Sequence, residues 1–382
     1  MASWISIAQL VLLGLVVVLL LWLALRRGDA DATDRLERNL RADVQDSARG
    51  TRGELSQSLA TFQQTLLAQQ GIDLWSCLTC GLCSQYCPQG VGYLDFMRDA
   101  RRNGKPDVDC VAHKSVFNLV SRLMIAFPEK SGVPTDFKGE RDDTSPVGYF
   151  PGCIDYLDSF LEVGTSFRPI GESALKLMNA AGVTPRVMGL KCCGHDELWQ
   201  GNQEAFDELR RLNTRAIQES GIKTLVASCA ECTRTFAIDY SLDVEVLHIS
   251  QFLERYSEKL SFKGEGTVTY HDPCRLGRHM QIFDPPRNLL ASVKGLRVAE
   301  LENSREDCQC CGISAWLRCS TESKALLVKK LEEAEQTGAA TLLTACTKCL
   351  AHLNCVLNEK PPLKEFKVAV QDITSFLADR LA

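Results

Sequence analysis

The chain begins with one long apolar run. Residues 5–25 (ISIAQLVLLGLVVVLLLWLAL) carry no charge, and a helix of that length reaches about 30 Å, the thickness of the hydrocarbon layer of a membrane. A cleaved signal peptide is the alternative, but no Lys or Arg precedes the run, which is also longer than a usual signal core. Arg26 and Arg27 follow it. The positive-inside rule therefore predicts a single-pass anchor over residues 1–27 in the inner (cytoplasmic) membrane, with the rest of the chain in the cytoplasm.

Residues 28–70 are polar and charged, with apolar positions at helical spacing that Gly50 and Gly53 interrupt. This pattern predicts a helical stalk, and a flexible linker remains the alternative. Residues 71–145 show two further helical patterns, Tyr93 to Arg102 and Ser115 to Phe127, which predict a small helical domain ending in a polar linker.

From Val147 onward, short apolar runs alternate with helical patterns, and this order occurs twice. The predicted strands are Val147 to Phe150, Pro185 to Leu190, Lys223 to Ala227, Val244 to His248, Gly266 to Tyr270, Thr341 to Thr344 and Phe366 to Val370. Short buried strands alternating with helices are typical of parallel sheets. We therefore predict an α/β fold with two repeated modules, residues 146–262 and 263–382.

Cysteine usage changes this picture most. The chain has 18 cysteines in 382 residues, many of them in C-x-x-C and C-C arrangements that suit metal or cluster ligands better than a disulfide framework. The net charge of −5 gives no reason to expect nucleic acid as a partner.

One cysteine pattern is written twice, once in each module. The first thiol set is Cys153, Cys192, Cys193, Cys229 and Cys232, and the second thiol set is Cys274, Cys310, Cys311, Cys346 and Cys349. Both C-x-x-C pairs are separated by the same 117 residues (229 to 346, 232 to 349). Ligands in parallel sheets gather beyond the carboxyl ends of the strands, where these cysteines lie. We expect each set to converge on one crevice and the two modules to face each other. Five thiolates are too many for one zinc ion and suit an iron–sulfur cluster.

A separate run, C-x2-C-x2-C-x3-C-P, occupies residues 77–88 and has the spacing of bacterial ferredoxins. Cys77, Cys80 and Cys83 are predicted to hold three corners of a [4Fe–4S] cubane cluster. The fourth ligand is left open between Cys87, Cys110 and a protein partner.

Other residues near the cysteines have two readings each. His195, His271 and Asp272 either supply a proton or hold a loop by hydrogen bonds. Arg275, Arg278 and His279 either bind an anionic substrate tail or lie on the solvated surface. Cys308, Cys319 and Cys355 fall outside both sets and are expected to pack as buried thiols, with Cys308 as a possible substitute ligand. Trp75, Trp199 and Trp316 are expected to be packing residues.

The phrases YFPGC (149–153), KCCG (191–194), SCAEC (228–232), YHDPC (270–274), CCG (310–312) and ACTKC (345–349) resemble the cysteine-rich CCG-domain iron–sulfur proteins, among them the B-type and D-type subunits of heterodisulfide reductases. The ferredoxin-like segment resembles the C-type subunit of these reductases. The resemblance implies that each thiol set holds a noncubane [4Fe–4S] cluster. It also implies that the two clusters flank a disulfide substrate, with Cys193 and Cys311 as cluster ligands at that catalytic site.

The expected function is that of a membrane-anchored iron–sulfur oxidoreductase subunit that interconverts a disulfide and thiols. Its partners would be a flavoprotein or b-type cytochrome and a thiol or disulfide small molecule. The alternative is an electron-transfer component of a quinone-linked dehydrogenase of the glycolate, lactate or glycerol 3-phosphate type, with no substrate chemistry of its own. A third reading is a redox scaffold without turnover.

Overall fold

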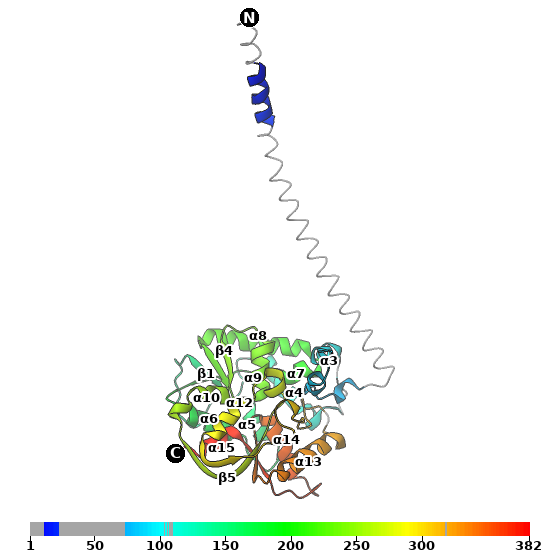
Figure 1. Cartoon of the computed structure of the whole chain (residues 1–382), viewed down its shortest axis with the longest axis vertical. Coiled ribbons are helices and arrows are strands. Elements are labelled where there is room, and N and C mark those ends of the chain that lie inside the picture. Colours follow the sequence, from blue (N-terminus) through cyan, green and yellow to red (C-terminus); the bar gives the residue numbers. More distant parts are fainter. Residues whose placement is uncertain (1–10, 23–72, 103, 105, 107–109, 318) are drawn as a thin grey trace. The chain divides into compact units, whose positions relative to one another are not determined.

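Two parallel four-stranded sheets organise the folded part of the chain (Figure 1). The computed structural model describes residues 11–22, 73–102, 104, 106, 110–317 and 319–382. The strand order is β2-β1-β3-β4 in the first sheet and β6-β5-β7-β8 in the second, and every pairing is parallel. The predicted α/β fold with two repeated modules is confirmed.

The first module is built around two central strands whose residues are almost all buried. In β3, the residues Leu225, Val226 and Ala227 are fully buried, as expected for a strand that helices cover on both faces. The strands are β1 (Val147–Phe150), β2 (Arg186–Val187), β3 (Thr224–Ala227) and β4 (Glu245–His248). The helical elements are α5 (Ile154–Phe160), α6 (Arg168–Ala180), α7 (His195–Gln200), α8 (Gln203–Ser220), α9 (Ala230–Arg234), η4 (Thr235–Asp239), α10 (Ile249–Arg255) and η5 (Ser257–Lys259).

The second module repeats this arrangement with one strand that the hydrophobic pattern did not predict. That strand, β6, lies at the edge of its sheet and pairs only with β5, and most of its side chains are exposed or half-buried. The strands are β5 (Phe262–His271), β6 (Val293–Val298), β7 (Thr341–Thr344) and β8 (Ala369–Asp372). The helical elements are α11 (Gly277–Met280), α12 (Asp284–Ala291), η6 (Arg305–Asp307), α13 (Thr321–Gln336), α14 (Thr347–Leu357) and α15 (Ile373–Ala378).

The two modules pack on each other reciprocally. Helix α6 of the first module packs on α15 of the second, and the corresponding helix α12 of the second packs on α10 of the first (Figure 1). Equivalent helices of the two modules thus make the same contact in both directions, as expected for modules related by an approximate twofold axis. The carboxyl ends of both central strand pairs therefore meet between the modules.

The ferredoxin-like segment precedes the first module and is helical, as predicted. Its elements are η1 (Leu74–Ser76), α2 (Leu82–Gln85), α3 (Tyr93–Arg101), η3 (Ala112–Ser115) and α4 (Val116–Ala126). The two predicted helices agree with α3 and α4 to within one residue at each end.

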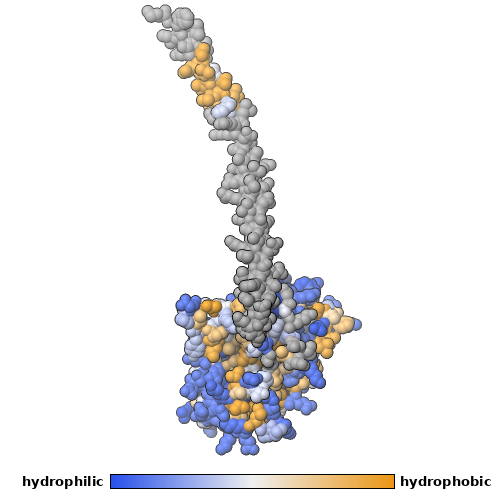
Figure 2. Space-filling model, turned by 90° about the vertical axis from the view of Figure 1, so that its right-hand side faces the viewer, coloured by the Kyte–Doolittle hydropathy of each residue, from blue (hydrophilic) through white to orange (hydrophobic). Residues whose placement is uncertain are grey.

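The described residues 11–22 belong to a different unit from the described residues after residue 72. Of the predicted anchor, the structure describes residues 11–22, which are helical and expose their apolar side chains (Figure 2). Within the described residues, no helix is both long enough and apolar enough to cross a membrane. The rest of the predicted anchor and the predicted stalk, residues 28–70, lie outside the described residues.

Candidate iron–sulfur site

The first thiol set gathers where three strands of the first module end. Strand β1 leads to Cys153, the loop after β2 carries Cys192 and Cys193, and β3 leads to Cys229, which precedes α9. Because Cys229 is the N-cap of α9 and Cys232 lies in its first turn, both C-x-x-C thiols face the same side. The thiols form a line of neighbouring contacts in the order Cys153, Cys192, Cys193, Cys232, Cys229.

The second thiol set repeats this line in the second module. Cys346 is the N-cap of α14 in the same extended conformation that Cys229 adopts, and the Sγ atoms of Cys311 and Cys349 are 3.1 Å apart. The thiols make contact in the order Cys274, Cys310, Cys311, Cys349, Cys346.

The two lines meet at one point. Cys229 and Cys346 occupy equivalent positions in the repeat, and their thiols contact each other. Equivalent residues touch only where the local twofold axis passes. The two lines of five thiols thus touch where the modules meet, and the convergence of each set on a crevice of its own stays a prediction.

The donor set fits iron–sulfur clusters. None of the 18 cysteines, all of which lie in the described residues, is in a disulfide. Eight of the ten thiols in the two sets are buried, and Cys153 and Cys274 are half-buried. A row of buried, unbridged thiols gains little from packing alone, whereas sulfur donors in this number suit clusters of iron.

The glycine of each C-C-G sequence has a left-handed backbone, with φ of +82° at Gly194 and +79° at Gly312. A Cβ atom would lie 2.8 Å from the ring of Phe206 in the first case and 2.6 Å from the carbonyl oxygen of Ser323 in the second. Both positions therefore require glycine for the turn and for close packing on the following helix.

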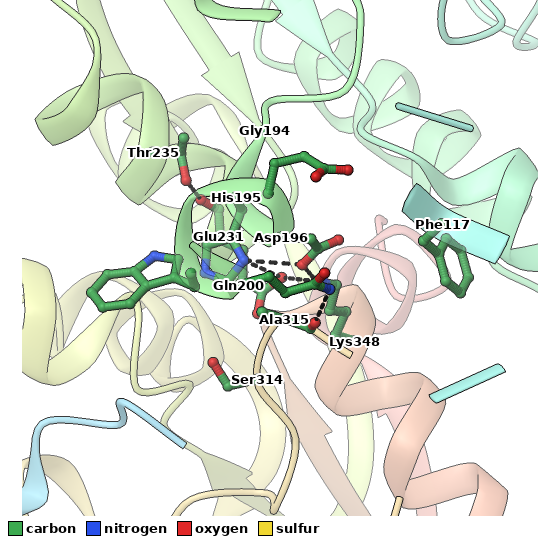
Figure 3. A network of polar contacts seen from close by, with 12 residues as sticks. Phe117, Gly194, His195, Asp196, Gln200, Glu231, Thr235, Ser314, Ala315 and Lys348 are labelled. Carbon is green, nitrogen blue, oxygen red and sulfur yellow. Dashed lines mark hydrogen bonds and ion pairs between the residues drawn. The ribbon is translucent and has the colours of Figure 1, made fainter. Parts of the chain in front are cut away.

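A buried ion network links the modules beside the thiols (Figure 3). Lys348 Nζ lies 2.7 Å from Glu231 Oε2 and also pairs with Asp196. His195 Nδ1 lies 3.2 Å from Asp196 Oδ1 and 3.4 Å from Glu231 Oε2. Since Arg275 Nε donates to His195 Nε2 over 3.0 Å, that nitrogen is the acceptor and Nδ1 carries the proton toward the carboxylates.

Burial and the ammonium group of Lys348 have opposite effects on the pKa values of the two carboxyl groups in this network. Burial alone would raise the pKa of Asp196, but Lys348 and His195 outweigh it and lower the pKa to about 2. The pKa of Glu231 is raised, because for this carboxyl burial outweighs His195 and Lys348. His195, Asp196 and Glu231 have the donor types of a metal site, but the ammonium group of Lys348 already occupies the cation position.

A small cleft opens beside the network. Its wall combines thiols, the ion network and apolar rings, among them Phe117 and Trp316, which stack with centroids 4.2 Å apart. The thiols in the wall are Cys153, Cys192, Cys193, Cys229 and Cys232. The cleft therefore opens directly onto the first thiol set.

The ferredoxin-like loop lies against the second module. The thiol of Cys80 contacts that of Cys310, and this contact lowers the pKa of Cys80 to about 5. Arg278 Nε donates to the carbonyl oxygen of Cys80 over 2.8 Å, and Arg275 donates to both the carbonyl and the hydroxyl oxygen of Thr79. The loop carbonyls are thus held by buried guanidinium groups.

Three of the four ferredoxin-like cysteines share one environment. Burial raises the pKa of Cys77, and the nearby charges of Cys80 and Cys83 add a smaller effect in the same direction. The pKa of Cys87 is instead lowered by backbone N–H groups of residues 89–91. Cys110 precedes Val111, which bridges to Leu317 of the second module. The fourth ligand stays open between Cys87, Cys110 and a protein partner.

The prediction that the arginines lie on the solvated surface is wrong. Arg275 and Arg278 are 2% and 9% exposed and hold the ferredoxin-like loop, and their binding of an anionic substrate tail stays a prediction. His279 Nε2 also lies 3.0 Å from the Thr79 carbonyl oxygen. Charge spacing cannot reveal this, because the partners are carbonyl groups of Thr79 and Cys80, almost 200 residues away in the sequence.

The remaining residues act mainly as supports. Asp272 forms a buried ion pair with Arg287, and His271 Nδ1 lies 3.4 Å from the buried thiol of Cys308. Cys319 and Cys355 are not buried as predicted: Cys319 is exposed, Cys355 is half-buried, and both line a separate cavity. Trp75, Trp199 and Trp316 make packing, hydrogen-bond or ring contacts, as predicted.

Sequence reasoning missed Asp196, Glu231 and Lys348, and it missed Arg101, which is fully buried and donates to the carbonyl oxygens of Leu74, Cys77 and Trp199. One signal was available. Glu231 and Lys348 stand at the same place inside the two C-x-x-C pairs, with opposite charges.

Comparison with known proteins agrees with this geometry. The sequence profile of the cysteine-rich CCG domain matches residues 147–237 and 268–354. The chain is 30% identical over 334 residues to the D-type subunit of the dihydromethanophenazine:CoB–CoM heterodisulfide reductase of Methanosarcina barkeri, covering 81% of this chain and 78% of that protein. It is 29% identical to the B-type subunit of the fumarate reductase (CoM/CoB) of Methanothermobacter marburgensis, covering 77% of this chain and 59% of that protein.

It is also 25% identical to the EtfAB:quinone oxidoreductase of Syntrophomonas wolfei, covering 63% of this chain and 36% of that protein. Among solved structures, a hypothetical protein of Helicobacter pylori superposes with a TM-score of 0.51 at 10% identity, covering 77% of this chain and 59% of that one. This last likeness concerns the fold alone.

Proposed function

Because this chain belongs to the family of iron–sulfur proteins with two CCG domains that includes the D-type subunits of heterodisulfide reductases, we propose that it interconverts a disulfide and two thiols. The observation that carries the proposal is the cleft whose wall contains a complete set of five thiols. Cleavage of a disulfide consumes two electrons and yields two thiolates, which become thiols on taking up two protons.

The thiols of the chain are the ligands in this proposal. Cys77, Cys80 and Cys83 with a fourth ligand would hold a [4Fe–4S] cubane cluster, and each thiol set would hold one noncubane [4Fe–4S] cluster. Such clusters, when bound, supply one-electron transfers. Around them, the burial of the thiols excludes water, and Phe117 and Trp316 give the cleft an apolar wall for the organic part of a disulfide.

The ion network has a positioning role in this site. His195 donates from Nδ1 and accepts at Nε2, so neither ring nitrogen is free to receive a proton from a substrate. Lys348, Asp196 and Glu231 all line the cleft, so the cation is held there by its two carboxylate partners. The network thereby holds α9 and α14, and with them both C-x-x-C pairs, in one register.

The experiment is anaerobic purification of the full chain, counting of iron and sulfide, and EPR with and without an added thiol. We expect about twelve irons for three four-iron clusters and a signal that changes on thiol addition. Cys355→Ser, a substitution outside both thiol sets, serves as the control and keeps all signals. A full iron complement with no response to any thiol or disulfide would contradict the proposal.

The likeness to the EtfAB:quinone oxidoreductase favours a second candidate, an electron-transfer component of a quinone-linked dehydrogenase. In that case, the partner performs the substrate chemistry, and the clusters exchange electrons with a flavoprotein but do not respond to thiols. The EPR experiment with added thiol therefore separates the two candidates.

We also propose that residues 5–25 anchor the protein in the cytoplasmic membrane, with the thiol sets on the cytoplasmic side, where thiols stay reduced. Membrane fractions washed with alkaline carbonate should retain the full chain and release a chain that lacks residues 1–27. Release of both would refute the anchor. Partner proteins of the flavoprotein or b-type cytochrome kind would then co-purify with the detergent-extracted chain.

A further inference from the structure

Two cysteines outside both thiol sets share a small cavity in the second module. Four side chains with sulfur or nitrogen atoms line this cavity, and the rest of its wall is apolar: Cys319, Cys355, His113 and His352. Neither cysteine is in a disulfide. The cavity therefore brings two free thiols together, away from the ten thiols of the two sets.

The two thiols differ in their access to solvent. Cys319 is exposed, whereas Cys355 is half-buried. The imidazole of His352 lies beside the thiol of Cys319 and lowers its pKa, and burial raises the pKa of Cys355. An exposed thiol with a lowered pKa is the form of cysteine that attacks other sulfur atoms, and a second thiol nearby can resolve the product.

Both cysteines lie on the segments that carry the second thiol set. Cys319 comes eight residues after the C-C pair of that set, and Cys355 lies in α14, six residues after the C-x-x-C pair. The first module has Gly201 and Ile238 at the corresponding distances from its own pairs. The thiol pair is therefore specific to the second module, and a bond between its members would join the two segments that hold four of the five cysteines of the second set.

The cavity is also in direct contact with that set. His352 Nδ1 lies 2.9 Å from the carbonyl oxygen of Cys311, so this buried imidazole connects the cavity wall with a predicted cluster ligand. A change in the cavity can therefore act on the second set.

We propose that Cys319 and Cys355 form a thiol pair that exchanges with small-molecule disulfides and closes into a disulfide of its own. The thiolate of Cys319 attacks one sulfur of the small disulfide, which forms a mixed disulfide and releases one thiolate. Cys355 loses its proton to solvent and attacks Cys319 Sγ, which forms the bond between the two cysteines and releases the second thiolate. The pair thereby loses two electrons, and the small disulfide takes up both and becomes two thiols.

This reaction needs no iron, so it does not rest on the proposed iron–sulfur function. The two have the same class of small molecule in common. A pool rich in disulfides would close the pair, and the closed pair would tie the segments around the second set together. We expect iron to leave the closed form at least twofold more slowly when a chelator is added.

The test uses the anaerobically prepared full chain and oxidised glutathione as the small disulfide. After alkylation of free thiols with iodoacetamide, tandem mass spectrometry should find Cys319 joined to Cys355. Cys355→Ser should stop at a chain with one glutathione on Cys319, and Cys319→Ser should leave Cys355 unmodified. Cys308→Ser, which removes another cysteine outside both sets, is the matched control and should keep the bond.

A bond from Cys319 to any other cysteine, or a wild-type chain that stops at the glutathione adduct, would overturn the proposal. Uptake of one zinc ion per reduced chain, lost in both variants, would overturn it as well, because the cavity would then be a metal site. The bond in the wild-type chain decides the matter even if a variant does not fold. A missing EPR response to thiols would refute the proposed function and leave this result untouched.

Discussion

In the first module, Glu231 stands between the cysteines of the C-x-x-C pair, and in the second module, Lys348 occupies the same position and pairs with it. The residues that follow C-C-G differ as well. His195 and Asp196 begin a helix in the first module, whereas the corresponding Ile313 and Ser314 lie in a loop. The five cysteines thus have the same positions in both modules, whereas the residues around them differ. Two equal ligand sets can therefore have unequal surroundings.

The largest expected effect comes from removing the central cation. Lys348→Met leaves Asp196 and Glu231 buried without their positive partner, so we expect a loss of about 3–5 kcal/mol in the free energy of unfolding. Glu231→Gln is the matched change in the other module. It should cost only about 1–2 kcal/mol, because Lys348 keeps Asp196. Urea denaturation of the purified chain measures both, and similar losses in the two variants would contradict the assigned asymmetry.

The next comparison uses the two C-C-G glycines. An alanine at either position has an unfavourable positive φ, but at Gly312 its Cβ would also press on a backbone carbonyl that cannot rotate away. We expect Gly312→Ala to cost about 3 kcal/mol and Gly194→Ala, which meets only the edge of Phe206, about half of that. Thermal unfolding of the two variants checks the order, and a greater loss for Gly194→Ala would contradict it.

A smaller effect distinguishes the two modules by pH. Burial lowers the pKa of His248, the N-cap of α10, to about 4, and it raises the pKa of Asp372, the equivalent N-cap of α15, to about 7. Unfolded His takes up a proton near pH 6.5 and unfolded Asp loses one near pH 3.9. His248 therefore costs stability as the pH falls from 6.5 toward 4, and Asp372 costs stability as the pH rises from 4 toward 7.

Melting temperatures recorded across this range test these two slopes. Asp372→Asn should remove a loss of about 1 kcal/mol between about pH 6 and about pH 7, since the amide oxygen can still accept from the N–H groups of α15. His248→Asn should remove the loss on the acidic side. An unchanged pH profile in either variant would show that the residue does not titrate as assigned.

The smallest expected effect concerns one hydroxyl. Thr347 Oγ1 donates to Cys229 Sγ over 3.4 Å, whereas Ala230 at the equivalent position has no hydroxyl to offer Cys346. Such a bond stabilises the more negative, reduced state of a cluster. Thr347→Val should therefore lower the midpoint potential of the first set by an amount worth about 1 kcal/mol or less, with the second set unchanged. Redox titration followed by EPR measures this, and equal shifts of both signals would contradict it.

The sequence allowed the fold and the thiol sets to be predicted because both depend on local patterns. Strands such as β3 and β7 are short apolar runs that end at a cysteine, and parallel sheets place such ends together. Edge strand β6 was missed because an edge position tolerates the polar side chains of Lys294 and Arg297.

The support for the site could not be predicted in the same way. From the sequence, Arg101, Arg275 and Arg278 would be expected on the surface. Each is instead buried and donates to carbonyl oxygens that are distant in the sequence. The cysteine ligands and their spacing can be identified in the sequence. The partners of a buried charge depend instead on how the modules and the ferredoxin-like loop pack together.

The pairing of Glu231 with Lys348 also constrains the history of this chain. An ancestor made from two identical copies of one module would have placed the same residue on both sides of the axis, and two like charges only 2.7 Å apart repel each other when buried. Opposite charges at this position stabilise the contact between the first and the second module. They would not stabilise the same contact between two copies of one module.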